Sequence, residues 1–430
     1  MTSANALHHR DPTDSEPSRV RLGFVPLTDA APIIIAKERG FFRKVGLDVS
    51  LSREPSWSNI RDKLTAGILD AAPVLAPMAL AADLGIGGFS TPLVTALSLG
   101  LNGNAITLSP ELFRQMTELD PAGMAERPRS ARPLRRAIEA RRHGGDRRLT
   151  LAAVFPFSAH MYELRYWLAA AGIDPDRDLR IIVAAPPTMV GLLRAGNIDG
   201  FCVGEPWSSY ASQLGCGKVV VAKYDIWNNS PEKVLAVTRD WHDQHPRTHA
   251  ALIRALVEAA RWLDDPEHRL EAAHVISGES FIDAPVDAVR PSLLGEFDDV
   301  ERDDNTDFHV FHRYAATFPW QSHALWLLGQ MWRWGQIDRA CDLPAIAERV
   351  YLPGFYRDAA APLDIATPAV NSKVEGQHGS PWTLTDATAP MRMGPDGFID
   401  GRVFDPAHWR EYLSAFDIAH PLIAIDRMRG

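Results

Sequence analysis

Short apolar runs alternate with amphipathic segments through the first part of the chain. Strands are expected from Val20, at 47–51 and at 93–99, with helices at 29–40 and 57–67 between them. The run that begins at Val20 reads as a parallel strand that is covered on both faces. Helices between such strands indicate βαβ units, and the pattern therefore predicts an α/β fold.

A second βαβ unit follows. An apolar run at 151–154 leads through Phe-Pro-Phe to Ser158, which opens a helix, and another apolar run follows at 179–183. His160 is expected in the first turn of that helix, where unpaired backbone N–H groups and the positive end of the helix dipole favour an anion. A Pro-Pro break, a helix and the sequence GFCVGEPW at 200–207 complete the unit. A ligand-facing loop after each strand is typical of a binding protein, and His160 makes an anion the expected ligand.

The rest of the chain reads mainly as helices. Amphipathic helices are expected at 246–263 and 324–339. The arginine-rich segment 111–148 either forms a solvated helix and loop or contacts an acidic partner. A segment rich in Pro, Gly, Ser and Thr at 365–398 is expected to wrap the surface as irregular chain.

Composition narrows the classes of function. With 430 residues and 46% hydrophobic content, the chain can bury a large core and is expected to form two lobes. A net charge of −9 argues against direct nucleic-acid binding, and no apolar run is long enough to predict a membrane span. The three cysteines have neither disulfide-framework nor metal-ligand spacing, so no metal or cofactor is expected. The helical face of the histidines around His245 is interrupted by Pro246, which argues against zinc. Motifs of phosphate loops, dinucleotide folds and nucleophile elbows are missing from the sequence, so the chain is not expected to be an enzyme.

Several longer motifs stand in one order along residues 18–425. They are RLGFVPLTDA (21–30), AKERGFFRKVGL (36–47), PSWSNIRDKL (55–64), NGNAITL (102–108), FPFSAH (155–160), IWNNSPEKV (226–234) and DGRVFDP (400–406). Together they resemble the nitrate- and bicarbonate-binding proteins of ABC transporters, the NrtA and CmpA family, and most closely its cytoplasmic nitrate/nitrite sensors of the NasS type. The resemblance implies a two-lobed, periplasmic-binding-protein-like fold of type II, with the ligand cleft between the lobes.

The expected organisation follows from the apolar pattern and from this resemblance. Residues 1–19 are polar and are expected to form a disordered arm. Residues 20–104 form the first part of lobe I, and residues 105–222 form lobe II. Residues 223–430 return to lobe I with C-terminal helices and a wrapping tail.

Carrying the family pattern onto this sequence implies a ligand set. Trp57 matches the tryptophan of the SWxxxRDxL motif, His160 the histidine after the FP turn, and Lys233 the pocket lysine. Asn104 stands where the transporter proteins have a glutamine, so its amide is one methylene shorter. Three further candidates lie in loops at strand ends, where open α/β sheets hold ligands: Thr28, Gly204 and Glu205.

The expected ligand is nitrate or nitrite. Nitrate is planar and has no proton to donate, so its site needs hydrogen-bond donors, positive charge and an apolar face. Bicarbonate is nearly the same shape but carries a proton, so it needs an acceptor, a role that Glu205 or Glu232 could fill. Lys233 beside them favours the anion without a proton. Alkylsulfonates and thiamine precursors, ligands of related proteins, would need a longer slot.

The first residues, MTSANALHHRDPTDSEPSRV, have no apolar core of a secretory signal, and the chain is therefore expected in the cytoplasm. A cytoplasmic receptor must pass its signal to another protein. The resemblance implies that this partner is an ANTAR-type, RNA-binding antiterminator, held in the absence of nitrate and released when nitrate binds. The alternative is the solute-binding component of a nitrate or bicarbonate ABC transporter.

Overall fold

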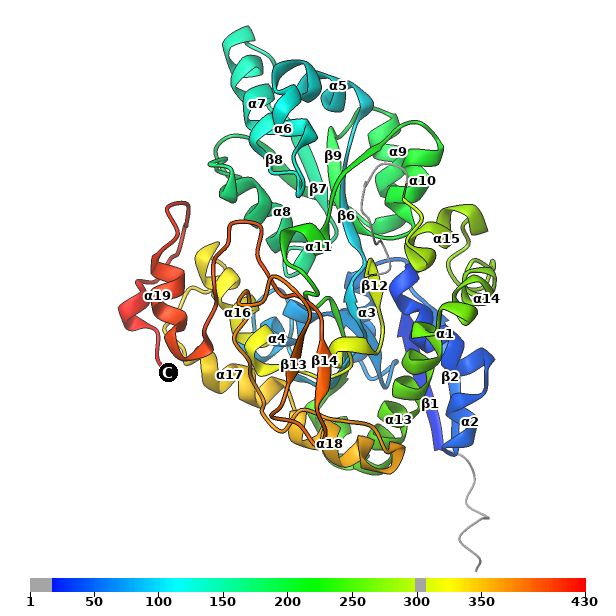
Figure 1. Cartoon of the computed structure of the whole chain (residues 1–430). Coiled ribbons are helices and arrows are strands. Elements are labelled where there is room, and N and C mark those ends of the chain that lie inside the picture. Colours follow the sequence, from blue (N-terminus) through cyan, green and yellow to red (C-terminus); the bar gives the residue numbers. More distant parts are fainter. Residues whose placement is uncertain (1–17, 298–306) are drawn as a thin grey trace, which may run out of the picture.

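The computed structural model describes residues 18–297 and 307–430, which form two lobes (Figure 1). The expected N-terminal arm lies outside the described residues except for Ser18 and Arg19. These two residues already belong to strand β1 (Ser18–Phe24), so the first strand begins two residues before Val20. Their register with the neighbouring strand β2 (Leu47–Arg53) continues the parallel ladder to Ser18.

The sheet of lobe I is built from five strands far apart in the sequence. β1 pairs in parallel with β2, and a parallel bridge between Leu22 and Ala71 brings β3 (Ala72–Leu75) to the other side of β1. β11 (Lys233–Thr238) lies antiparallel between β3 and β4 (Leu93–Ser98). The site candidate Lys233 is thus the first residue of a central strand.

Helices cover this sheet as the apolar pattern predicts. The expected helix at 246–263 is α13 (Pro246–Asp264), and the expected helix at 324–339 is α16 (Gln321–Arg333), which ends earlier. The other helices of this lobe are α1 (Ala31–Glu38), α2 (Phe41–Lys44), α3 (Trp57–Thr65), α4 (Ala76–Leu84), α12 (Arg239–Gln244), α14 (Pro266–Ile276), α15 (Val286–Leu294), α17 (Leu343–Val350), α18 (Pro353–Ala360) and α19 (Trp409–Ser414).

Lobe II contains a five-stranded sheet in the order β10-β6-β9-β7-β8. β7 pairs in parallel with β8 and β9, whereas β6 is antiparallel to β9 and β10. The strands are β6 (Asn104–Leu108), β7 (Thr150–Ala153), β8 (Arg180–Val183), β9 (Gly200–Gly204) and β10 (Lys218–Ala222). The helices are α5 (Pro110–Leu119), α6 (Pro121–Ala125), α7 (Arg132–Gly144), α8 (Ala159–Ala170), α9 (Met189–Arg194) and α10 (Trp207–Gln213).

The arginine-rich segment is a folded part of lobe II. Helix α7 buries Leu134, Ala137 and Ile138, while Arg135 and Arg136 are exposed. The helix therefore has an apolar face toward the lobe and a charged face toward solvent.

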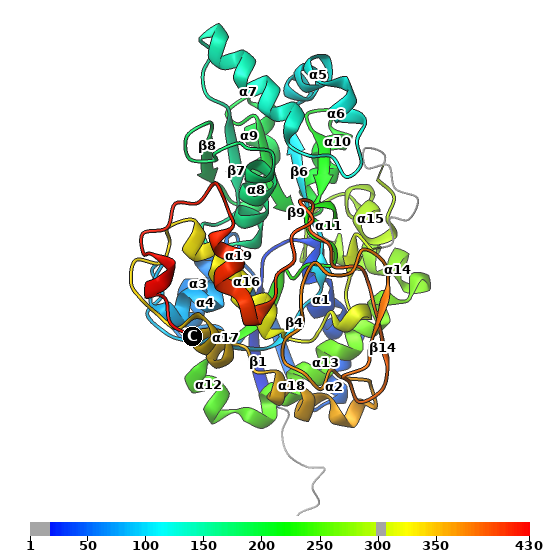
Figure 2. The same ribbon diagram turned by 60° about the vertical axis from the view of Figure 1, so that its left-hand side comes forward.

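Two short elements mark the passage between the lobes. β5 (Leu101–Asn102) precedes β6 and pairs with β12 (His309–Val310), and α11 (Lys223–Ile226) carries the chain back from β10. The C-terminal tail then wraps over lobe I, with β13 (Trp382–Leu384) and β14 (Met391–Met393) as a small hairpin (Figure 2). It also reaches lobe II, where Asp400 accepts a hydrogen bond from Tyr166 of α8 at 2.9 Å. Phe398 of the tail stacks on Trp227 next to the return crossing, with 4.7 Å between ring centroids.

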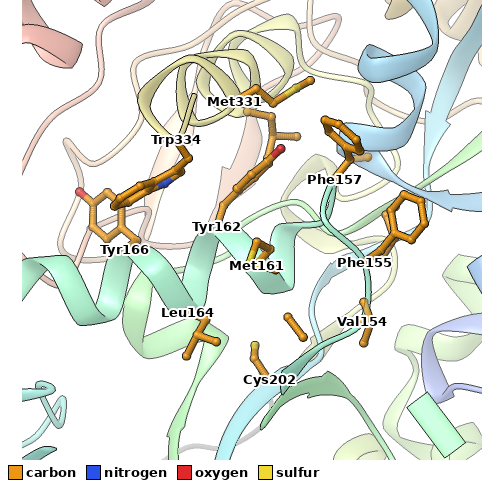
Figure 3. Packing of buried hydrophobic residues seen from close by; sticks show 14 of the residues in the cluster. Val154, Phe155, Phe157, Met161, Tyr162, Leu164, Tyr166, Cys202, Met331 and Trp334 are labelled. Atoms are coloured by element: carbon orange, nitrogen blue, oxygen red, sulfur yellow. The ribbon is translucent and has the colours of Figure 1, made fainter. Parts of the chain in front are cut away.

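Helix α8 is held on two sides. Tyr162 and Tyr166 face Met331 and the neighbouring Trp334, whereas Leu164 points to the side of Cys202 on β9 (Figure 3). The hydroxyl of Tyr162 also donates a hydrogen bond to Gln336, at 2.5 Å. Packing against both lobes fixes the orientation of α8, which carries His160. Among the described helices, none is both long and apolar enough to cross a membrane.

Candidate anion-binding site

The four principal site candidates meet where the lobes join. Trp57 is the first residue of α3, whose N-terminus is capped by Ser56, and Lys233 begins β11. From the other side come Asn104, the first residue of β6, and His160, the second residue of α8. Their exposed fractions are 2% for Trp57, 1% for Asn104 and Lys233, and 0% for His160, so the lobes are closed over them.

Helix α8 presents His160 because of its own start signal. Ser158 has extended backbone angles and accepts a hydrogen bond from the Met161 N–H at 3.0 Å. This cap satisfies one of the free amides of the first turn. The amides of Ala159 and His160 have no acceptor within the helix itself, because the helix begins there. The positive end of α8 therefore points into the junction beside the imidazole.

Two buried lysines organise the charges of the junction. Lys233 lies 2.5 Å from the Asp29 carboxylate and 2.9 Å from that of Glu232. Lys223 lies 2.6 Å from both Glu163 and Glu232. Each ammonium is thus held between two carboxylates, and Glu232 is shared by the two lysines.

Asn104 extends this network across the lobes. Its amide nitrogen donates to Glu232 at 2.6 Å and to Glu163 at 3.2 Å. Glu163 stands on α8 of lobe II and Glu232 precedes β11 of lobe I. The shorter amide therefore closes a bridge of carboxylates and lysines, while its own Oδ1 atom is buried and accepts no hydrogen bond from the described residues.

His160 is neutral in this environment. Burial lowers the pKa of His160 to about 3, against the opposing effect of Glu232. Its Nδ1 atom lies 3.2 Å from a Glu232 oxygen, yet neither ring nitrogen has an aligned hydrogen-bond partner within the described part of the chain. One ring nitrogen of a neutral imidazole carries a proton, so His160 can donate one hydrogen bond to a ligand.

Trp57 is also poised without a partner. Its indole N–H is buried and has no acceptor among residues 18–297 and 307–430. The Lys233 ammonium lies 5.6 Å from the centre of the Trp57 ring, within the range of a cation–π contact. Trp57 therefore offers the junction an apolar ring face and one unused donor.

The three weaker candidates line the same junction. Gly204 lies beside two polar groups of the junction. A Cβ atom on Gly204 would lie 3.4 Å from both Asn104 Oδ1 and Asp29 Oδ2. Thr28 donates its backbone N–H to the Glu205 carbonyl at 2.7 Å, which joins the lobes directly. Burial raises the pKa of the Glu205 carboxyl to about 7, although the Ser209 N–H hydrogen bond opposes the rise. Its second carboxyl oxygen is buried without a hydrogen bond from the described residues.

The charges of the network do not sum to a positive pocket. Burial would raise the pKa of Glu232, but it lies below its ordinary value: a charged His160 would lower it, and Lys223 and Lys233 lower it as well. Since His160 is neutral, the two lysines supply that effect. Burial raises the pKa of Asp29 and of Glu163 despite the lysines beside them. With all three carboxylates ionised and both lysines charged, the network carries three negative and two positive charges, a net of −1.

Two other groups that contain histidine lie outside the junction. Nδ1 of His242 lies 2.9 Å from Nδ1 of His249, and both rings pack edge-on or tilted against Phe355. On the surface, His420 lies near Asp174 and Asp176. Asp176 is already paired with both terminal nitrogens of Arg165. Neither group therefore forms a strong metal site.

A sequence profile described as the NMT1-like family matches residues 13–277. The chain belongs to this family. It is 33% identical to the nitrate/nitrite binding protein NrtA of Synechococcus elongatus, over 92% of this chain and 85% of that protein. It is 38% identical to the nitrate import ATP-binding protein NrtC of a Synechocystis strain, over 92% of this chain and 55% of NrtC. The chain thus spans about half the length of the NrtC relative.

The fold is also similar to that of an NrtA protein. The crystal structure of the periplasmic nitrate-binding protein NrtA from Synechocystis superposes with a TM-score of 0.81 and 29% identity, covering 94% of this chain and 99% of NrtA. The expected two-lobed binding-protein fold is confirmed. The resemblance to the NrtA and CmpA family is confirmed as well.

Sequence reasoning overlooked half of the network. Asp29, Glu163 and Lys223 were not expected at the site, and Glu232 was considered only as an acceptor for bicarbonate. One signal was available for Asp29, which is the single charge in the otherwise largely apolar stretch TDAAPIII. If such a charge is buried, it needs a partner of opposite charge or a hydrogen bond.

Proposed function

We propose that this protein binds nitrate or nitrite at the junction of its lobes, without catalysing a reaction. Trp57, Asn104, His160 and Lys233 are the proposed ligand residues. The observation that carries the proposal is the set of unused polar atoms there. Trp57 contributes a buried donor from lobe I, and His160 contributes a buried ring nitrogen from lobe II. Buried polar atoms without partners cost free energy, so their presence indicates a ligand that satisfies them.

The chemistry favours a planar anion of low hydrogen-bonding demand. The indole and imidazole N–H groups and the Lys233 ammonium can each donate to an anion oxygen, and the Trp57 ring offers an apolar face. Nearby Asp29, Glu205 and Glu232 could accept the proton of bicarbonate, which keeps that anion as the competing ligand. The names of the NrtA relatives support nitrate or nitrite first.

Isothermal titration calorimetry with nitrate, nitrite and bicarbonate tests the binding proposal. Micromolar binding of nitrate or nitrite, weakened by Trp57→Phe and by Lys233→Met, is the expected result. Binding of bicarbonate alone would replace the ligand, and no heat from any of the three anions would overturn the assignment.

The finer proposal is that the protein is a cytoplasmic nitrate/nitrite sensor. In this account it sequesters an ANTAR-type, RNA-binding antiterminator and releases it when the anion closes the lobes. The resemblance to NasS-type sensors supports this role. The alternative role is the solute-binding component of an anion ABC transporter.

The energetics of such a switch are adequate. Micromolar binding corresponds to about 8 kcal/mol. Shifting a partner from 1:99 to 99:1 needs a differential of about 5.5 kcal/mol. An anion that binds only the partner-free form can supply this difference, and by linkage the partner must weaken anion binding by the same factor.

Size-exclusion chromatography of the purified chain with a purified ANTAR-type antiterminator separates the two roles. The sensor role predicts a complex without nitrate that dissociates when nitrate is added. No complex in either condition, together with nitrate-dependent association with a transporter permease, would support the alternative. Whether the arginine-rich segment contacts an acidic partner is tested by reversing exposed charges of α7 such as Arg135 and Arg136, which leaves the buried residues of the helix in place.

A further inference from the structure

Lys233, the proposed anion ligand, already has an anion bound to it. Asp29 belongs to the 3-10 turn η1 (Thr28–Ala30), and its Oδ2 atom lies 2.5 Å from the Lys233 ammonium. Both residues stand on lobe I, Asp29 after β1 and Lys233 at the start of β11. Opening the lobes therefore leaves this ion pair intact, and the pair is part of the site that a ligand meets.

The Asp29 carboxylate also lies where the ligand is expected. The same Oδ2 atom is 3.4 Å from the position of a Cβ on Gly204, as is Asn104 Oδ1. A carboxylate is a planar anion with two oxygens, and it resembles part of a nitrate ion in shape and charge. Asp29 thus occupies the face of Lys233 that turns toward lobe II and toward the other candidates.

Lys233 has little positive charge left for a further anion. Glu232 binds it from the other side, at 2.9 Å. With Glu163 and Lys223 included, the ionised network has a net charge of −1, and an incoming nitrate would raise this to −2 in a buried junction. Desolvated like charges repel strongly, so this excess must be removed as the ligand binds.

We propose that Asp29 is an internal competitor for the anion, and that binding requires its carboxylate to take up one proton from solvent and release Lys233. The inference rests on the proposed function at this site. The proton converts Asp29 from an acceptor for Lys233 into a neutral carboxyl group that can donate to the bound anion. Bicarbonate brings a proton of its own and needs this uptake less, so Asp29 also influences which anion is preferred.

The described groups around Asp29 determine how the proton is bound. Lys233 and Lys223 favour the ionised carboxylate, whereas Glu232 opposes it. Burial is the largest effect, and it raises the pKa of Asp29. Glu205 lies close in the chain fold, because its carbonyl accepts the N–H of Thr28. Glu205, His160 and Glu163 are the other groups at the junction that could take up a proton, and the experiment must distinguish them.

Calorimetric titration with nitrate in two buffers of different ionisation enthalpy measures the protons taken up on binding. For the wild-type chain we expect uptake to approach one proton per anion, and Kd to rise about tenfold per pH unit between roughly pH 7 and 8. In Asp29→Asn the amide cannot take the proton, so uptake and pH dependence should disappear and nitrate should bind more tightly at the higher pH. The control is Asp48→Asn, at an exposed position on β2, which should behave as wild type.

Each other outcome is decisive. Uptake that persists in Asp29→Asn but disappears in Glu205→Gln, Glu163→Gln or His160→Asn would assign the proton to that group and overturn the proposal. Wild-type binding that is independent of pH would overturn it while leaving the proposed function intact. No nitrate binding by wild type or Asp29→Asn at any pH would overturn both.

A second readout does not depend on the folding of a variant. Infrared difference spectra of the wild-type chain should show the carbonyl band of a protonated carboxyl group appear when nitrate is added. The band should shift when aspartate alone is labelled with carbon-13. A band that responds only to labelled glutamate, or no band at all, would contradict the assignment to Asp29.

Discussion

We expect His160 to lower the stability of the anion-free protein while it strengthens nitrate binding. Its imidazole is fully buried, and among the described residues neither ring nitrogen has an aligned hydrogen-bond partner. A buried polar atom left unsatisfied costs about 1–3 kcal/mol. Nδ1 recovers part of that cost through Glu232 at 3.2 Å, whereas Nε2 recovers none from the described residues. Replacing His160 with leucine, which is similar in volume, should therefore stabilise the anion-free protein by about 1–3 kcal/mol.

The same substitution should weaken nitrate binding. A hydrogen bond to a charged ligand contributes about 1.5–3 kcal/mol, which is roughly a tenfold to hundredfold increase in Kd. Urea denaturation in nitrate-free buffer measures the first effect, and calorimetry measures the second. His143→Leu, at an exposed position on α7, is the control and should change the unfolding free energy by less than about 0.5 kcal/mol. A His160→Leu protein that is less stable than wild type, or that binds nitrate equally well, would refute the reasoning.

Three further predictions follow from the same network. Lys233→Met leaves Asp29 and Glu232 without their shared ammonium, so urea denaturation should show a loss of about 3–5 kcal/mol in the free energy of unfolding. Adding Asp29→Asn should recover part of this loss. An unchanged denaturation midpoint would contradict the burial of the pair. Folding raises the pKa of Glu205 from 4.5 to about 7, so the folded chain holds this proton more tightly and the stability it gives is lost as pH rises through that window. The loss should amount to about 3 kcal/mol, at 1.36 kcal/mol per pH unit, and should be missing from the pH–stability curve of Glu205→Gln. Ser158→Ala removes the cap of α8 and should lower the free energy of unfolding by about 1 kcal/mol in urea denaturation. It should also weaken nitrate binding. Unchanged nitrate binding would show that the cap does not contribute to the site.

The helices and strands of this fold could be predicted from the sequence because each depends on the local pattern of apolar and polar residues. The apolar run after Val20, the capped helix at Ser158 and the amphipathic helix from Pro246 all form near their expected positions. Errors occur at element ends. The helix expected to begin at 324 begins at Gln321, because the residues preceding the expected start also pack into the core.

The sequence predicted part of the candidate site. Trp57, Asn104, His160 and Lys233 meet at the junction. The local pattern already pointed to His160, whereas only the resemblance pointed to the other three. The ion-pair network could not be read in the same way. Asn104 and Glu232 are 128 positions apart, and their contact depends on how two lobes close. A lone charge in an apolar run signals a buried partner, but the sequence does not say which residue that partner is.

The central claim is that one planar anion binds between Trp57, His160 and Lys233. A high-resolution crystal structure of the nitrate complex tests it most directly. We expect density for a planar anion within hydrogen-bond distance of His160 and Lys233, with the Asp29 carboxylate displaced from the ammonium or turned to donate to the anion. Nitrate bound elsewhere, or a junction identical to the anion-free one in crystals saturated with nitrate, would contradict the account.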